Sequence, residues 1–126
     1  IHAYPSIWIE CNSRSVIEAM SAGALCVHPN YGGLIDTSGG MNFMYQGHHD
    51  LNTHANIFYQ ALDNAIQVVN TEQVQNYLQL VKTYADSRYN WAKITQQWID
   101  LFENLKRGYP TAESRKIPKP SFVYRT

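Results

Sequence analysis

Cysteine, excess charge and long apolar runs are all scarce in this chain of 126 residues. Two cysteines, Cys11 and Cys26, are too few for a disulfide scaffold, so we expect a reducing compartment, with the cytoplasm as the default. Ten basic and ten acidic residues give a formal net charge of zero, which supplies no electrostatic reason to expect nucleic acid or an anionic membrane as a partner. No apolar run approaches the ~20 residues of a membrane span, and no signal peptide is visible. Because the first residue is Ile1, we expect a piece of a longer chain.

Short apolar runs alternate with turns in the first fifty residues. The runs at 1–4 and 25–28 are each followed by a proline, Pro5 and Pro29, and are typical of short buried strands that end there. Residues 42–45 predict a third short strand after a Gly-Gly turn.

A helix is predicted between the first two of these strands. Its N-cap would be Asn12 or Ser13 and its C-cap Gly23, and its apolar residues recur at helical spacing: Val16, Ile17, Ala19 and Met20. Strand, helix and strand joined at this length predict a βαβ unit, and therefore a parallel sheet. We expect an α/β protein with a partial Rossmann-like parallel sheet, followed by packing α-helices.

Three apolar stripes at helical spacing follow residue 50, so we expect helices that pack on the sheet. The third stripe runs through Trp91 and Trp98, which we expect in the core rather than in a sugar-binding platform. Residues 109–126 hold three of the five prolines and several charges, which predicts an extended tail.

Two glutamates, Glu10 and Glu18, lie eight positions apart at the start of the first helix. On an ideal helix Glu18 faces away from the apolar stripe, so spacing alone predicts an exposed i,i+4 ion pair with Arg14, worth roughly 0.3–0.5 kcal/mol. Glu10 ends the segment that leads from strand to helix, at the carboxyl edge of the sheet, where open parallel sheets bind ligands. The amides of residues 12–15 then form a helix N-terminus suited to a phosphate.

These residues occur in a recognisable order. The segment contains Pro5-Ser6, then Glu10, then the run Glu18-Ala19-Met20-Ser21-Ala22-Gly23, then a strand, and then Gly32-Gly33. This order resembles the C-terminal half of the donor-binding domain in group 1 (family four) glycosyltransferases of the GT-B fold. The resemblance extends over residues 1 to about 106, so we assign 1–108 to that portion and leave 109–126 as a tail.

The resemblance implies a role for each glutamate. Glu18 would bind the 2′- and 3′-hydroxyls of the donor ribose, and Glu10 would lie beside the donor sugar, with its negative charge near a developing oxocarbenium ion. It further implies transfer with retention of configuration, no metal and no cofactor. The donor would be a nucleotide sugar, UDP- or GDP-linked, and the acceptor a sugar, a lipid or a protein.

The helix N-terminus has its own implied role. Backbone N–H groups of Asn12, Ser13 and Arg14 would hold sugar hydroxyls and the diphosphate, with Ser15 close by. In this family an upstream half-domain and an entire acceptor domain complete the enzyme, so we do not expect turnover by these 126 residues alone. The sheet edge that should meet the upstream strands would be open, which predicts self-association.

Other interpretations stay open. The chain could be a non-catalytic nucleotide-binding or protein-interaction module derived from the same fold. A metal site at His48, His49, Asp50 and His54 is disfavoured by their spacing, and a polar turn that begins a helix is expected instead. Cys11 is not expected to act as a nucleophile, because no base is placed beside it by the sequence.

Overall fold

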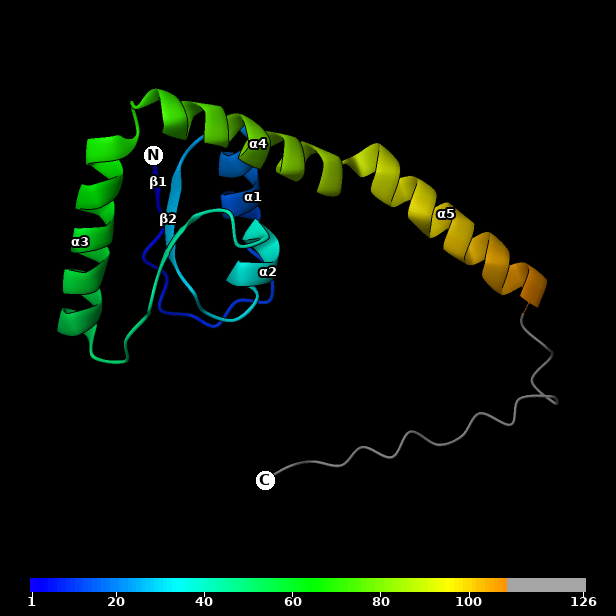
Figure 1. Cartoon of the computed structure of the whole chain (residues 1–126). Helices are drawn as coiled ribbons and strands as arrows, with labels where there is room; N and C mark the ends of the chain where they lie inside the picture. The colour runs from blue at the N-terminus through cyan, green and yellow to red at the C-terminus, as the bar shows by residue number, and fades with distance from the viewer. Residues whose placement is uncertain (109–126) are drawn as a thin grey trace. The chain divides into compact units, whose positions relative to one another are not determined.

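The computed structural model describes residues 1–108, and Figure 1 shows the strands and helices that they form. The described residues fall into two units, residues 1–90 and residues 91–108. The predicted tail at 109–126 lies outside the described residues.

The first unit contains a small parallel sheet in the order β1-β2-β3. The strands are β1 (His2–Ala3), β2 (Cys26–Pro29) and β3 (Phe43–Tyr45). Helix α1 (Arg14–Ser21) connects the first pair, and a short helix, α2 (Leu34–Ser38), connects the second. The predicted βαβ unit and parallel sheet are therefore confirmed, whereas α2 was not foreseen.

Strand β2 continues through Pro29, one residue beyond its predicted end. The N–H of Tyr4 donates to the carbonyl oxygen of Val27 (2.9 Å), and the N–H of Asn30 donates to that of Tyr45 (2.9 Å). Odd-numbered residues of β2 thus bond toward β1 and even-numbered ones toward β3. Since β1 has already ended where Pro29 lies, the missing N–H of the proline leaves no strand partner unsatisfied.

Helix α1 begins and ends close to the predicted residues. Ser13 is its N-cap residue, and Gly23 follows its C-terminus with a φ of 77°, a left-handed conformation that glycine adopts without a steric penalty. The N–H of Gly23 donates to the carbonyl oxygen of Met20 (3.0 Å), which closes the last turn. Val16 and Met20, one turn apart, are fully buried.

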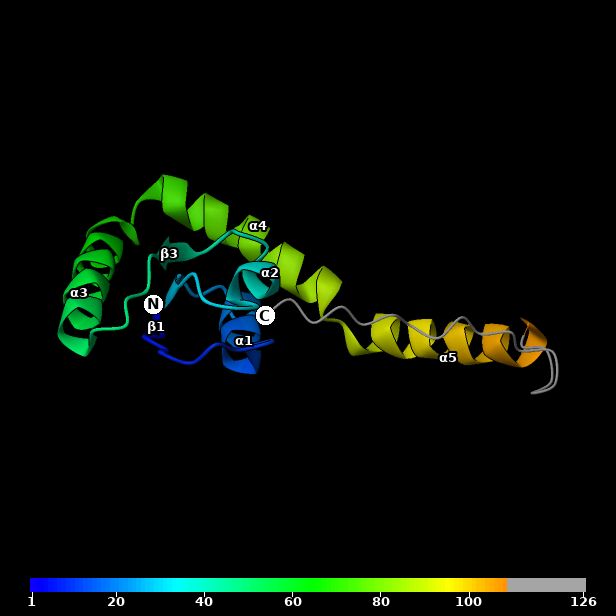
Figure 2. The same cartoon turned by 90° about the horizontal axis from the view of Figure 1, so that it is seen from below.

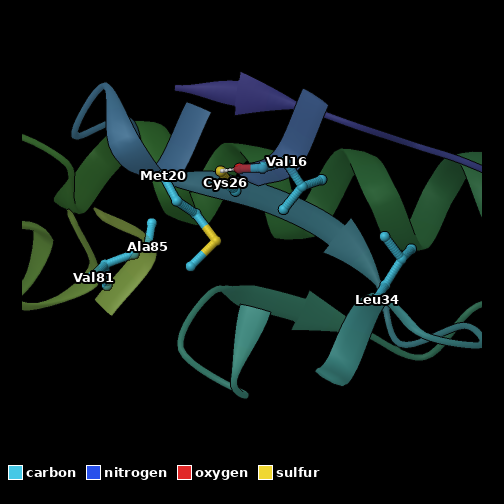
Figure 3. Close-up of a cluster of buried hydrophobic side chains, with 6 residues drawn as sticks. All are labelled: Val16, Met20, Cys26, Leu34, Val81 and Ala85. Atoms are coloured by element: carbon cyan, nitrogen blue, oxygen red, sulfur yellow. Dashed lines mark hydrogen bonds between the residues drawn. The ribbon is translucent and has the colours of Figure 1, made fainter. Parts of the chain in front are cut away.

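Two apolar clusters lie on the two faces of the sheet. One surrounds Cys26 and is drawn in Figure 3, where side chains of α1 and α4 (Glu72–Arg88) converge on β2; its members are Val16, Met20, Cys26, Leu34, Val81 and Ala85. The other lies between the sheet and α3 (Leu51–Val68), and contains Leu25, Val27, Tyr45, Ala65 and Leu78. Because Cys26 and Val27 point to opposite faces, β2 contributes to both clusters. Figure 2, turned by 90°, shows α3 and α1 on opposite sides of the strands.

Helix α5 (Trp91–Gly108) belongs to the second unit, and none of its residues is buried. Trp91 is 81% exposed and Trp98 is 54% exposed, so the prediction that both belong to the core is wrong. The helical spacing of the two tryptophans indicates an apolar face that could be buried against another element. Because α5 is the one described element of its unit, that unit supplies no described helix or strand to cover this face. No helix within residues 1–108 has the length and apolar character needed to cross a membrane.

Candidate functional site

Glu10 lies in the segment that passes from the carboxyl end of β1 to α1, as predicted. The hydroxyls of Tyr4 and Ser6 both donate to its Oε1, the latter at 3.2 Å. The Ser6 hydroxyl oxygen accepts in turn from the N–H of Trp8 at 3.2 Å. These bonds orient the half-buried carboxylate and leave Oε2 with no partner among residues 1–108. A fixed carboxylate with one free oxygen is suited to accept a ligand hydroxyl.

The Gly32-Gly33 turn packs directly against the backbone of this segment. The N–H of Gly33 donates to the carbonyl oxygen of Glu10 at 2.6 Å. A Cβ on Gly33 would lie 2.0 Å from the carbonyl oxygen of Cys11, and one on Gly32 would lie 2.6 Å from that of Glu10. Gly32 also has a φ of 51°, a conformation that side-chain-bearing residues rarely adopt. Both positions therefore require glycine if the two segments are to approach this closely.

The N-terminus of α1 follows immediately and is open. Ser13 is buried, but its hydroxyl makes no capping bond and lies 3.2 Å from that of Ser15. Within residues 1–108, no acceptor receives the backbone N–H groups of Asn12, Ser13 and Arg14. The side chain of Asn12 is bound by α2, because its Oδ1 accepts from the Thr37 hydroxyl at 2.9 Å. Free amides at a helix N-terminus can receive an anion.

Glu18 lies on the solvent side of α1, as its spacing predicts. Its Oε1 is 3.4 Å from Nε of Arg14, and the two side chains are 69% and 90% exposed. The predicted i,i+4 ion pair is therefore confirmed. The structure does not bring Glu18 into the hydrogen-bonded group around Glu10 within residues 1–108.

A cavity of about 200 Å³ lies at the same carboxyl edge, beside the segment that contains Glu10. Its walls come from that segment and from the loops after β2 and β3: Ile7, Ile9, Tyr31, His48, His49 and Leu51. Neither Glu10 nor Glu18 lines this cavity, so the cavity does not bring the two glutamates together.

The histidines near residue 50 form a polar turn and a helix start, as expected. Asp50 is the N-cap of α3, and its Oδ1 accepts from the N–H of Thr53 at 2.8 Å. Bonds from Thr53 to this carboxylate lower the pKa of Asp50 below its usual value. His54 is buried, with Nε2 3.0 Å from the Tyr45 hydroxyl. Among residues 1–108 there is no group of three His, Cys, Asp or Glu side chains that could hold a metal ion.

Sequence reasoning missed the side chains that orient the site. Tyr4 and Ser6 bind Glu10 across six and four residues of an irregular segment, and Thr37 reaches Asn12 from twenty-five residues away. A weak signal existed for Ser6, which belongs to the Pro-Ser pair of the motif. No periodicity points to Tyr4 or Thr37.

No family model, curated protein or solved structure matches this chain. Its function is therefore inferred from the motif and from the geometry of the site.

Proposed function

We propose that residues 1–108 form the C-terminal portion of the donor-binding domain of a retaining, metal-independent glycosyltransferase of the GT-B fold. One observation supports this most: at the carboxyl edge of a parallel sheet, Gly32-Gly33 packs on the backbone of Glu10 and Cys11, directly before the uncapped N-terminus of α1. A glycine-rich close approach, an oriented carboxylate and free helix amides together suit a sugar linked to a diphosphate.

Each group has a role in this proposal. The diphosphate is held at the amides of Asn12, Ser13 and Arg14, where the helix dipole favours negative charge. The free oxygen of Glu10 accepts from a donor-sugar hydroxyl and places negative charge near the oxocarbenium ion that develops as the leaving group departs. Glu18 accepts from the ribose hydroxyls. It can give up its ion pair with Arg14 to do so at little cost, because exposed ion pairs contribute little to stability.

The remaining expectations belong to the same proposal. The acceptor, whether a sugar, a lipid or a protein, meets a separate domain, so this chain alone binds the donor without turnover. The backbone of Ala3 faces away from β2 and has no strand partner within residues 1–108, so self-association through this edge of β1 is expected. Both cysteines are free, which agrees with a cytoplasmic location.

Removing the charge of Glu18 tests the proposal. Glu18→Gln removes the negative charge and replaces one of the two carboxylate oxygens, each proposed to accept from a ribose hydroxyl, by an NH2 group that can only donate. We therefore expect a loss of about 2–4 kcal/mol of binding free energy, or ~30- to 1,000-fold weaker binding of the nucleotide. Isothermal titration of UDP and of GDP into wild type and variant measures this loss.

The chain offers a matched control. Glu103 forms another exposed i,i+4 pair, with its Oε2 3.5 Å from Nη2 of Arg107. Glu103→Gln should leave nucleotide affinity unchanged. If Glu18→Gln and Glu103→Gln behave alike, Glu18 is an ordinary surface charge and the ribose site is wrong.

A further inference from the structure

We propose that the outer edge of β3 and the apolar groove beside it bind an extended, uncharged peptide segment as an additional strand. This inference is independent of donor binding, because it concerns the strand edge on the far side of the sheet from β1. It rests on two separate observations, one on the backbone of β3 and one on the side chains next to it.

The backbone of β3 has an unpaired side. The register pairs Val27 with Phe43 and Pro29 with Tyr45, and the Asn30 N–H donates to the carbonyl oxygen of Tyr45. Alternate residues of a strand bond in opposite directions, so Phe43 and Tyr45 bond toward β2. The N–H and C=O of Met44 therefore face outward, and neither has a partner within residues 1–108. Such a pair is a template for an incoming strand.

An apolar groove of about 650 Å³ runs beside this edge, between β3, the end of α3 and the first half of α4. Leu80 and Tyr77 are 64% and 37% exposed on its wall. The residues that line it are Phe43, Val68, Thr71, Gln73, Val74, Asn76, Tyr77 and Leu80. None of them carries a formal charge, so the groove suits a neutral apolar side chain and disfavours a charged one.

The two features fit one ligand. Side chains of neighbouring strands that lie side by side point to the same face of a sheet. A residue added next to Phe43 would therefore direct its side chain to the face on which Phe43 contacts the groove. Backbone bonds to Met44 would supply affinity, and the groove would select a large apolar side chain at one position of the peptide.

The test uses the soluble neutral peptide acetyl-Thr-Thr-Phe-Thr-Thr-amide and the full chain labelled with ¹⁵N. Titration should shift the amide signals of Met44, Val74 and Leu80, and the peptide with alanine in place of phenylalanine should bind about 10-fold more weakly. Leu80→Ser should weaken the phenylalanine peptide by a similar factor. Ile66→Ser, at a position on α3 that is 55% exposed and outside the groove, is the matched control and should change nothing.

Two N-methylated peptides test the backbone bonds without altering the protein. One carries the methyl group on the phenylalanine nitrogen and the other on the nitrogen of the next residue. In a strand only one of these two N–H groups faces the edge of β3, so one peptide should lose binding and the other keep it. Equal binding by both, an alanine peptide as strong as the phenylalanine peptide, or no shift up to the solubility limit would each overturn the proposal.

Discussion

Gly33→Ala tests the close approach on which the candidate site is built. The φ of Gly33 is −78°, a value that alanine adopts freely, so any cost comes from the new methyl group and not from backbone strain. That methyl group would lie 2.0 Å from the carbonyl oxygen of Cys11 and 2.6 Å from its carbonyl carbon, so one segment must move. Movement also stretches the 2.6 Å bond from the Gly33 N–H to Glu10. Overpacking together with the weakened hydrogen bond gives an expected loss of about 2–4 kcal/mol of stability.

Urea unfolding followed by circular dichroism measures the loss, and Gly23→Ala is the control. Gly23 has a φ of 77°, and a Cβ added there would meet no atom within 4 Å, so alanine adds strain without a clash, about 1–2 kcal/mol. If the folded variant at Gly33 binds UDP as tightly as wild type, the close approach does not position the amides of α1 for a diphosphate. If it is no less stable than the variant at Gly23, the close approach itself is refuted.

Two further predictions concern titratable groups. His28 is fully buried, with Nδ1 2.9 Å from the carbonyl oxygen of Pro29, and burial lowers its pKa below the ordinary 6.5. As the pH falls, His28 takes up a proton more readily in the unfolded chain than in the folded one. The contribution of neutral His28 to stability is therefore fully present above about pH 6.5, and the free energy of unfolding should decrease below it by up to ~1.4 kcal/mol per pH unit. Urea unfolding with no such decrease between about pH 7 and 5 would contradict this. Burial also raises the pKa of the Cys26 thiol to about 12, whereas Cys11 is exposed. A thiol reagent should therefore modify Cys11 quickly in the native protein and Cys26 only after unfolding, and two fast thiols in the native state would show that the core is open.

Local patterns predicted those elements whose signals are contained within a few turns of chain. The spacing of Val16 and Met20, with Gly23 after them, located α1 to within a residue at each end. Asp50 behaved as a helix N-cap because a carboxylate can bond the amide three residues on wherever the chain turns into a helix. These interactions depend on sequence neighbours, so the sequence contains the information that they need.

Helix α2 was not predicted because it is too short to show a helical spacing of apolar residues, and because its sequence contains no run of strong helix-forming residues. Leu34, at its first residue, is fully buried in the cluster around Cys26, and Thr37 bonds to Asn12. Tertiary contacts thus stabilise a turn that propensity alone would leave irregular. The opposite error occurred at α5, where periodicity predicted burial but the unit that contains the helix supplies no described element to cover it.

The two interpretations of Glu18 place its side chain in the same position, so the ion pair with Arg14 agrees with both. They differ in what they require of the surroundings. A surface ion pair between Glu18 and Arg14 makes no demand on the residue at position 33, which lies in another segment. A ligand site requires the segment that holds Glu10 to be fixed against its neighbour, so that the carboxylate and the amides of α1 face one ligand together. The absence of room for even a methyl group at Gly33 shows that the segment holding Glu10 is packed closely against its neighbour, which is the arrangement that a ligand site would require.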